Sequence, residues 1–453
     1  MNNRNARDVS LDVLIRVERR QSYSNIELNN VLRRSELSPV DRSLVTELVY
    51  GTLQRRNTLD WVLSPFVSKG LNKLEVWVRE LLRMSVYQFK YLHKVPDRAA
   101  VHEAVEIAKR RGHRGVASFV NAVLRNVLRQ PKRLQTVDET DPVRKLALEH
   151  SHPEWIVKRW LKVWDTETVA AICEANNGSP AHTIRVNTLK TSRDELKRQL
   201  EREQPKVKVR CSNVTAQGLI VDGFGNIADS SWYRDGLCSI QDESSMLVGE
   251  VLQPTPGSTV VDLCAAPGGK ATHLAELMDD CGSLESYDIH THKVKLIAEQ
   301  AKRLGIHIVT AKQADARELP RLVRKQYDFV LLDAPCSGFG VIRRKPEIKW
   351  HKSAADIGTL VELQRELLDA AAQLVKPGGV FVYSTCTLEP RENEQQITWF
   401  LDRYPEFKPD QTLADVLPEH VTQKARLGTG MLRIFPQHFN SDGFFIARLK
   451  REK

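Results

Sequence analysis

The chain has 453 residues, of which 41% are hydrophobic and 27% are charged. This composition is typical of globular proteins and excludes a mainly disordered or fibrous chain. No stretch approaches the roughly 18 uncharged apolar residues of a membrane helix, and the first twenty residues contain no apolar signal core. We therefore expect a cytoplasmic protein, and the length alone allows two to four domains.

The positive charge is concentrated in the first third of the chain. Residues 1–150 contain 27 Lys and Arg against 17 Asp and Glu, which leaves 40 of each for the remainder. Within this third, residues 107–133 carry eight basic residues and no acidic one. Such a run is often only a solvated helix face. Its concentration in one region favours a polyanion-binding surface, and RNA or DNA is the obvious polyanion.

Residues 1–135 are predicted to form a helical bundle. Apolar residues recur at helical spacing, and the clearest stripe consists of Val116, Phe119, Val120, Val123, Leu124 and Val127. Ser38 followed by Pro39 is typical of a helix N-cap and a first-turn proline. Residues 136–239 read as a connector and a small α+β region, with helices near 153–164 and 192–203 and strands near 182–189 and 218–223.

From residue 240 onward, strand-like and helix-like segments alternate. Strands are predicted near 258–264, 283–289, 306–313, 327–333, 378–386 and 443–450, and the clearest helices lie near 291–305 and 360–375. Strands that are apolar on both faces and separated by helices indicate a doubly wound parallel sheet. Residues 240–453 are therefore expected to form an α/β, Rossmann-like domain.

The strand ends of this sheet carry the candidate ligand residues, because ligands lie across the carboxyl ends of the strands. The first strand leads into a glycine-rich turn within Asp262–Leu274, which matches neither the phosphate-binding GxxxxGK[ST] loop nor the dinucleotide GxGxxG pattern. Asp288, Asp315 and Asp333 follow the next three strands. Each acid alone could be a helix N-cap or a solvated loop residue. Together with the turn they favour a nucleoside cofactor without phosphate, which indicates S-adenosylmethionine, with Asp288 on the ribose and Asp315 on the adenine amine.

The cysteines are single and show no zinc-site spacing, so we expect no structural metal and no disulfides. They stand at positions 173, 211, 238, 264, 281, 336 and 386. Carbon 5 of cytosine is too weak a nucleophile to attack a sulfonium methyl unless a thiolate first adds to carbon 6. A base must then remove the carbon-5 proton so that the thiol can leave. Cys336 and Cys386 each end a predicted strand and are placed for this chemistry, whereas Cys264 is expected to pack inside the turn.

The chain resembles the RNA cytosine-C5 methyltransferases and, over nearly its whole length, the bacterial RsmB (Fmu/Sun) family of 16S ribosomal RNA enzymes. The matching stretches are RVNTLK (185–190), QDESS (241–245), DLCAAPGGKATH (262–273), DAPCSGFGVIRRKPEIKW (333–350), YSTCTLEPRENE (383–394) and DGFF (442–445). The N-terminal helices, with NAVLRNV at 121–127, resemble a NusB-like RNA-binding domain.

This resemblance implies an S-adenosylmethionine-dependent enzyme that methylates carbon 5 of cytosine 967 in 16S ribosomal RNA. It implies that Cys386 is the nucleophile and that Cys336 assists breakdown of the covalent adduct. The implied cofactor-binding residues are Cys264, Ala265, Ala266, Pro267, Gly268, Gly269, Lys270, Asp288, Asp315 and Asp333. Lys270 could instead orient the target base, and Arg343, Arg344 and Lys345 are expected to meet RNA phosphates.

The implied domains are a NusB-like RNA-binding domain (1–135), a linker with a small α+β RNA-binding subdomain (136–239) and a Rossmann-like catalytic domain (240–453). We expect a monomer with RNA as its partner and no membrane or metal. Two alternatives stay open. The first is the same chemistry on another rRNA site, on tRNA or on DNA. DNA cytosine methyltransferases attack with the Pro-Cys thiol, so the identity of the nucleophile discriminates. The second is a non-catalytic RNA-binding assembly factor.

Overall fold

The structure is a computed structural model that describes residues 5–425 and 427–453. It divides into two compact units. The helical unit comprises the chain up to Ser179 together with Ile342–Lys352, and the sheet unit comprises Pro180–Val341 and Ser353–Lys453. Within the described residues, no helix is long and apolar enough to cross a membrane, and no cluster of three His, Cys, Asp or Glu side chains could hold a metal ion.

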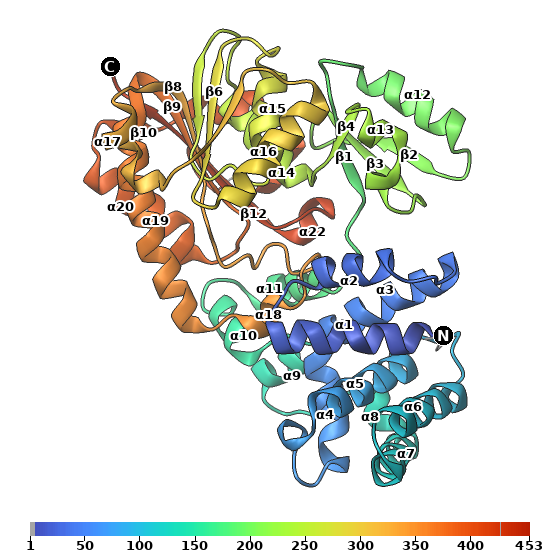
Figure 1. Ribbon diagram of the computed structural model, residues 1–453. Helices are drawn as coiled ribbons and strands as arrows, with labels where there is room; N and C mark the ends of the chain where they lie inside the picture. Colours follow the sequence, from blue (N-terminus) through green and yellow to red (C-terminus); the bar gives the residue numbers. More distant parts are fainter. Residues whose placement is uncertain (1–4, 426) are drawn as a thin grey trace. The chain divides into compact units, whose positions relative to one another are not determined.

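The helical unit confirms the predicted N-terminal bundle. Its α-helices are α1 (Ala6–Arg20), α2 (Ser24–Arg33), α3 (Pro39–Gln54), α4 (Arg56–Leu63), α5 (Val76–Tyr91), α6 (Asp97–Arg111), α7 (Arg114–Leu128), α8 (Pro131–Gln135), α9 (Pro142–Glu149), α10 (Glu154–Trp160), α11 (Thr166–Asn176) and α18 (Ile348–His351) (Figure 1). The Ser38 hydroxyl caps α3 by accepting from the Asp41 amide. The predicted apolar stripe of α7 packs into one core with α1, α3 and α5.

The segment Ile342–Lys352 reaches the helical unit from a distant part of the sequence. The Lys349 ammonium is buried and donates to the carbonyl oxygens of Gln54 and Ser151, each at 2.8 Å, and to Asn177 Oδ1 at 3.2 Å. These acceptors are neutral, and burial lowers the pKa of Lys349 well below its usual range. The segment is therefore an integral part of the helical unit.

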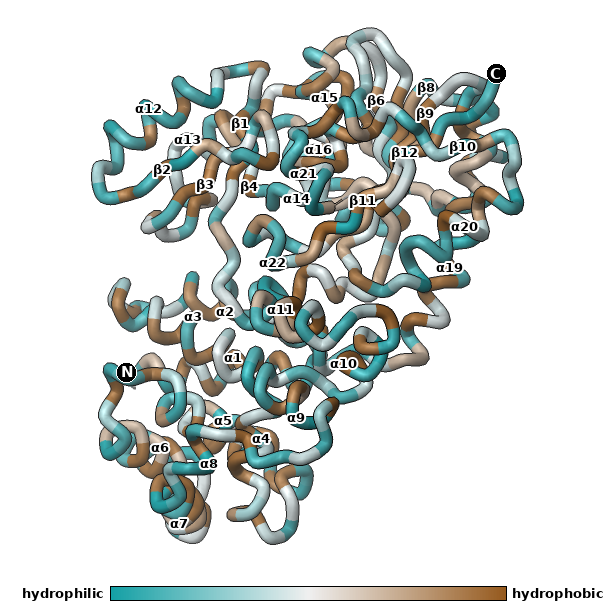
Figure 2. The backbone as a smooth tube through the Cα atoms, turned by 180° about the vertical axis from the view of Figure 1, so that it is seen from behind, coloured by the Kyte–Doolittle hydropathy of each residue, from teal (hydrophilic) through white to brown (hydrophobic). Residues whose placement is uncertain are grey.

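The smaller sheet belongs to the sheet unit and confirms the predicted α+β region. Its antiparallel strands run in the order β2 (Lys208–Cys211), β3 (Gly218–Asp222), β1 (Thr183–Val186) and β4 (Cys238–Ile240). The helices α12 (Arg193–Glu203) and α13 (Ser231–Arg234) accompany it. Figure 2 shows α12 as a mainly hydrophilic helix, and it contributes only Leu196 and Leu200 to the core.

The larger sheet is mixed, with five parallel strands and an antiparallel edge. Its order is β10 (Phe407–Pro409), β12 (Phe444–Arg451), β9 (Val375–Thr385), β8 (Tyr327–Asp333), β5 (Thr259–Asp262), β6 (Ser283–Asp288) and β7 (Val309–Gln313), and β11 (Met431–Ile434) also pairs with β12. Strands β9, β8, β5, β6 and β7 are parallel, as predicted. The last strand departs from a purely parallel sheet, because β12 runs antiparallel to β9, β10 and β11.

Helices cover both faces of the larger sheet (Figure 1). One face packs against α14 (Glu243–Leu252), α15 (Gly269–Leu277), α16 (Thr291–Leu304) and α21 (Glu419–Ala425), and the other against α17 (Leu319–Val323), α19 (Ala354–Leu374) and α20 (Glu394–Arg403). Neighbouring strand residues alternate between the two cores: Val260 joins the first and Val261 the second. This alternation follows from the two-residue period of a strand and confirms the doubly wound arrangement.

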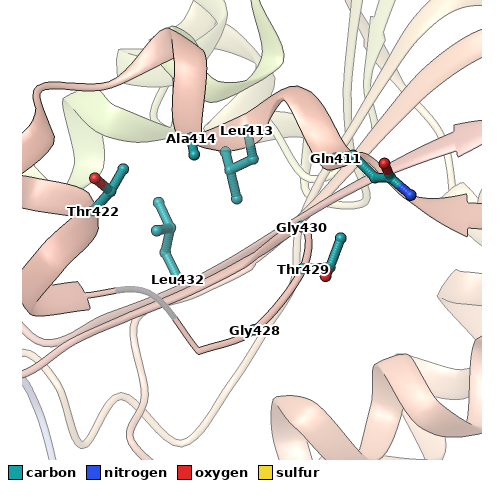
Figure 3. A pocket seen from close by; sticks show the side chains of 8 residues that line it. All are labelled: Gln411, Leu413, Ala414, Thr422, Gly428, Thr429, Gly430 and Leu432. Carbon is teal, nitrogen blue, oxygen red and sulfur yellow. The ribbon is translucent and has the colours of Figure 1, made fainter.

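A small hollow lies beside β11, lined by Gln411, Leu413, Ala414, Thr422, Gly428, Thr429, Gly430 and Leu432 (Figure 3). Its free volume is about 10 Å³. That volume is close to the space one water molecule needs, and it is far below the several hundred Å³ of a small-molecule site. The hollow is therefore not a candidate for binding a nucleoside.

A fully buried ion pair joins the smaller sheet to α15, a helix that packs on the larger sheet. Arg185 of β1 donates from Nε and Nη2 to the two carboxylate oxygens of Glu276 on α15, both at 2.8 Å, and both side chains are 0% exposed. Arg185 also donates to the Gly269 carbonyl at 2.7 Å, at the first residue of α15. The guanidinium therefore fixes the start of α15 against the smaller sheet.

We predict that Glu276→Ala lowers the free energy of unfolding by about 3–5 kcal/mol, because it leaves the buried Arg185 charge without its partner. Urea denaturation of the full chain measures the change. The control is Glu201→Ala on α12, whose carboxylate lies 3.8 Å from Lys197 at the surface and should matter by less than about 0.5 kcal/mol. Equal losses in the two variants would contradict the assignment.

Candidate active site

The glycine-rich turn lies at the carboxyl end of β5 and leads into α15, as predicted. Gly268 has φ of +103° and its amide donates to the Ala265 carbonyl at 2.7 Å. A Cβ at Gly268 would lie 3.1 Å from the Ile297 backbone, so this position favours glycine on both counts. A Cβ at Gly269 would meet no atom within 4 Å. The turn therefore leaves open space beside the first residue of α15, where backbone groups can approach a ligand.

The three predicted acids stand at successive strand ends of the same sheet edge. Asp288 ends β6, is 8% exposed, and accepts from the His290 amide at 3.0 Å. Asp315 follows β7 and caps a 3-10 turn, η4 (Ala316–Glu318), while the Arg317 guanidinium donates to both of its oxygens. Hydrogen bonding to Arg317 lowers the pKa of Asp315 and keeps it ionised. These two carboxylates are hydrogen-bond acceptors, as the sugar and amine of a nucleoside require.

Asp333, the third acid, forms an ion pair inside the site. Lys270 Nζ lies 2.7 Å from Asp333 Oδ2, and the Ser384 hydroxyl donates to Oδ1 at 2.8 Å. Burial would lower the pKa of Lys270, but the Asp333 carboxylate outweighs it and the pKa is raised. The ammonium also lies 5.1 Å from the centre of the Phe444 ring. Lys270 is therefore a charged group at this edge, held by Asp333.

Asp262 is a further buried acid whose side chain the sequence did not single out. It ends β5 and is 0% exposed. Burial, assisted by the nearby Asp333 carboxylate and opposed by Lys270, raises its pKa to about 7. Its position at a strand end was visible in the sequence, but complete burial is a property of the packed fold. Asp262 adds a group that titrates near neutral pH to the cofactor turn.

Cys336 and Cys386 come together, as their positions after β8 and at the end of β9 predict. Their sulfur atoms lie 3.4 Å apart. Hydrogen bonding to Cys386 and burial raise the pKa of Cys336 well above its usual range, so Cys336 retains its proton. The backbone joins the two loops as well, because the Gly340 amide donates to the Cys386 carbonyl at 2.9 Å. A protonated thiol is thus paired with a second thiol at one sheet edge.

The remaining cysteines lie apart from this pair. Burial raises the pKa of Cys173 and Cys238 to about 12 and that of Cys264 well above its usual range. Cys264 packs against a core of the larger sheet, as expected. Cys211 is partly buried and Cys281 is exposed. Raised pKa values make thiols unreactive, which suits a packing role for Cys173 and Cys238 and the packing role predicted for Cys264.

Comparison with known proteins identifies the family. Residues 249–450 match the family described as 16S rRNA methyltransferase RsmB/F, residues 4–129 match the NusB family, and residues 152–228 match an RsmF/B-like ferredoxin-like domain. A Bacillus subtilis (strain 168) protein named "Probable ribosomal RNA small subunit methyltransferase B" is 48% identical over 453 residues, covering 100% of both chains. The chain belongs to the RsmB/F family of 16S rRNA methyltransferases.

Two further matches extend over the whole chain. A Synechocystis (strain ATCC 27184 / PCC 6803 / Kazusa) protein named "Probable ribosomal RNA small subunit methyltransferase B" is 35% identical, covering 98% of this chain and 99% of its own. The crystal structure of PH0851 superposes with a TM-score of 0.82 at 30% identity and covers 99% of both chains. The predicted fold class of NusB-like, small α+β and Rossmann-like methyltransferase parts is therefore confirmed, as is the prediction of a methyltransferase.

The NusB-family region carries the basic run 107–133, but its charges are not equivalent. Arg110 and Arg111 are already paired with Asp8 and Asp12 at 2.5 and 2.7 Å. Five of the other six basic side chains line two hollows of about 500 and 720 Å³, and one of these five, Lys109, is paired with Glu106 at 2.7 Å. The first is lined by Val105, Lys109, Arg114, Ala117, Ser118 and Asn121, and the second by Trp61, Arg129, Gln130, Pro131, Lys132, Arg133, Thr136, Val137 and Asp138. This basic surface of α6–α8 is open to a partner.

One expectation about basic residues is wrong. Arg343 was expected to meet RNA phosphates, but it is 2% exposed and donates to the Ser179 carbonyl at 3.2 Å within the helical unit. Arg344 and Lys345 are partly buried, and the Lys345 ammonium lies 4.7 Å from the centre of the Tyr23 ring. The charges of the segment favoured contact with phosphates, whereas in the fold it packs into the helical unit.

The raised pKa of Asp262 predicts a pH-dependent stability. The folded protein holds this proton up to about pH 7, while the unfolded chain releases it near pH 4, so its contribution to stability falls as pH rises between these values. Asp262→Asn removes that loss. We expect its stability relative to the wild type to be about 3 kcal/mol more favourable at pH 8 than at pH 4.5, measured by urea denaturation, with exposed Asp402→Asn as the control. A difference that does not change with pH would contradict the burial of a titrating carboxyl.

Proposed function

We propose that this protein transfers a methyl group from S-adenosylmethionine to carbon 5 of a cytosine in 16S ribosomal RNA, through a covalent bond between Cys386 and carbon 6. The target we propose is cytosine 967, which rests on the family resemblance alone. The observation that carries the covalent chemistry is the pair of thiols 3.4 Å apart at the sheet edge. Methylation of oxygen or of an exocyclic nitrogen has no use for a thiol, whereas carbon 5 requires one.

The cofactor residues in this proposal are the turn and the acids of the same edge. Asp288 would accept hydrogen bonds from the ribose, and Asp315 from the adenine amine, which it can do while bonded to Arg317 because a carboxylate accepts several bonds. The open space at Gly269 and the backbone of Cys264, Ala265, Ala266, Pro267 and Gly268 would receive the rest. When bound, S-adenosylmethionine supplies the methyl group.

The proposed roles of the two thiols are those that the family resemblance implies, and the raised pKa of Cys336 is compatible with them. Cys386, as a thiolate, attacks carbon 6 of a base that has been extruded from any helix, and the ring then carries a nucleophilic carbon 5. Cys336, whose raised pKa keeps its proton on sulfur, stays neutral during the attack. After methylation, removal of the carbon-5 proton lets the bond between Cys386 and carbon 6 break. Cys336 assists this step, either as a relay that passes its own proton on to another acceptor as it takes up the carbon-5 proton, or as the base after its own proton has left. Lys270 and Asp333 would hold the polar edge of the cytosine.

The RNA surface in this proposal is the basic surface of α6–α8. The proposed division assigns RNA binding to residues 1–135 and 136–239 and catalysis to residues 240–453. Two hollows lined by basic side chains suit a folded polyanion, since phosphate contacts supply much of the affinity of nucleic-acid complexes. Methylation of tRNA or of another rRNA site is the main rival, and a family member that binds RNA without catalysis is the second.

The two thiols should give opposite results when removed. Cys386→Ala should lower methyl transfer to a 16S RNA transcript at least about 1,000-fold, because no adduct can form, and leave cofactor binding intact. Cys336→Ala should accumulate a covalent protein–RNA adduct that migrates slowly in a denaturing gel. Cys281→Ala, at an exposed thiol outside the site, should behave as the wild type.

The reverse pattern, with the adduct in Cys386→Ala and none in Cys336→Ala, would make Cys336 the nucleophile and support the DNA-type order of attack. Tight RNA binding without methylation by the wild type would favour the non-catalytic alternative. Bisulfite mapping of 16S RNA from a deletion strain identifies the nucleotide. Full methylation of cytosine 967 in that strain would contradict the proposed target.

The basic surface predicts a salt-dependent RNA affinity. Arg125 and Arg129 of α7 are exposed, and each donates only to a neutral asparagine, Asn121 and Asn126 respectively, among the contacts described. The double change Arg125→Gln/Arg129→Gln should weaken binding and lower the slope of log K against log salt by roughly 1.5, because each lost phosphate contact removes roughly 0.7–0.9. Filter binding at several salt concentrations measures both values.

The matched control carries the same charge loss on the sheet unit, at exposed Arg321 and Arg324. Arg321→Gln/Arg324→Gln should leave the slope within the error of the wild type. Equal slopes for the two double variants would show that the run on α7 is only a solvated helix face.

A further inference from the structure

A buried polar pair follows β9 and belongs to none of the groups assigned above. A 3-10 turn, η5 (Pro390–Glu392), ends at Glu392 and is followed by Asn393, the residue before α20. Both side chains are 0% exposed. Burying a carboxyl and an amide is costly unless they are hydrogen-bonded. The groups to which they bond therefore indicate why they are there.

Glu392 bonds to the loop that carries Cys336. Its Oε2 accepts from the backbone amide of Ser337 at 2.9 Å and from the Gln364 side chain, also at 2.9 Å. Gln364 Nε2 donates in turn to the Pro335 carbonyl at 2.9 Å. Pro335 and Ser337 are the two neighbours of Cys336. Glu392 and Gln364 therefore hold the backbone on both sides of this thiol.

Asn393 bonds in the same way to the loop that carries Cys386. Its Oδ1 accepts from the Thr385 hydroxyl at 2.6 Å, and its Nδ2 donates to the Thr387 carbonyl at 3.0 Å. Thr385 and Thr387 are the two neighbours of Cys386, and both are 0% exposed. One amide side chain thus bonds to the Thr385 side chain on one side of Cys386 and to the Thr387 backbone on the other.

The two sets of bonds belong to one network. Ser337 Oγ and Thr387 Oγ1 lie 2.7 Å apart and join the two cysteine loops directly. Glu392 is itself held, because the Tyr383 hydroxyl donates to its carbonyl at 2.7 Å. Glu392, the last residue of the turn, and Asn393, which follows it, therefore each hold the loop of one thiol. Such a connected and buried network is rigid.

We propose that Glu392 and Asn393 are positioning residues that set the spacing of the two thiols, Glu392 through the Cys336 loop and Asn393 through the Cys386 loop. The consequences for catalysis rest on the function proposed above. A misplacement of about 1 Å can cost roughly 100-fold in rate. Loss of Glu392 should therefore slow release of the adduct, which uses Cys336. Loss of Asn393 should slow the attack by Cys386.

The first experiment compares Glu392→Ala and Asn393→Ala in the full chain with radiolabelled S-adenosylmethionine and a 16S RNA transcript. Glu392→Ala should accumulate the covalent adduct at least about tenfold above the wild type, with single-turnover methyl transfer within about threefold. Asn393→Ala should lose at least about tenfold in single-turnover methyl transfer and accumulate no adduct. Proportional losses of both activities in both variants would overturn the separate roles.

Two variants separate positioning from folding. In Glu392→Gln the amide oxygen can still accept from Ser337, and because burial raises the pKa of Glu392, a neutral amide is a close substitute. It should restore both activities to within about threefold of the wild type. Ile397→Ala opens a cavity in the core of α20. It should lower the melting temperature without changing the ratio of adduct to product.

A second experiment needs neither RNA nor cofactor. Diamide takes two electrons and two protons from the two thiols, and one bond forms between the sulfur atoms of Cys336 and Cys386. The loss of two hydrogens is followed by mass spectrometry. The wild type and Glu392→Gln should form this disulfide rapidly, and Glu392→Ala and Asn393→Ala about tenfold more slowly.

Wild-type oxidation rates in both alanine variants would overturn the proposal. A Glu392→Gln variant that behaves as Glu392→Ala would also overturn it, because the carboxyl itself would then be required. A wild type that methylates no RNA contradicts the proposed function instead, and the oxidation rates then decide the positioning roles alone.

Discussion

The site depends above all on the parallel pairing of β8 with β9. Their register places Asp333 opposite Ser384, and the ladder continues as the Ala334 amide donates to the Ser384 carbonyl at 2.8 Å. Parallel neighbours deliver their carboxyl ends to the same edge, so Cys336 and Cys386 emerge side by side. A slip of one residue would turn every side chain of one strand to the opposite face and would separate the Ser384 hydroxyl from Asp333.

The charged groups at this sheet edge are one ammonium and two carboxyl groups, and their distances decide which carboxyl group pairs with the ammonium. Lys270 is the partner of Asp333, and Asp262 lies close enough to sense both. Burial raises the pKa of Asp262 to about 7, the nearby Asp333 carboxylate adds to this rise, and the Lys270 ammonium does not offset the two effects together. The same logic separates the thiols, because two sulfur atoms in contact do not both ionise easily. Asp262 in the first pair and Cys336 in the second are the members whose pKa is raised.

The sequence predicted the parts of the molecule that local patterns encode. The apolar period located α7 and the parallel strands, and the ends of those strands located Asp288, Asp315, Asp333 and both site cysteines. Long-range pairing was not encoded in this way, and the antiparallel course of β12 beside β9 became visible only in the fold. Burial was equally hidden: Asp262 and Glu392 look like ordinary acids until their surroundings are known. The burial of Lys349 was hidden as well, because composition does not show which carbonyl groups will surround a lysine.

The segment Ile342–Lys352 has a consequence for how such proteins are assembled from domains. The chain contributes two segments to the helical unit, and the second, Ile342–Lys352, follows closely after the loop of Cys336 in the sequence. The three acceptors of Lys349 are the carbonyl oxygen of Gln54 at the end of α3, the carbonyl oxygen of Ser151, and the side chain of Asn177 after α11. A NusB-like domain of this kind is therefore not an interchangeable module joined at a single linker. Any exchange between family members has to carry this short stretch of the methyltransferase sequence with the helices that receive it.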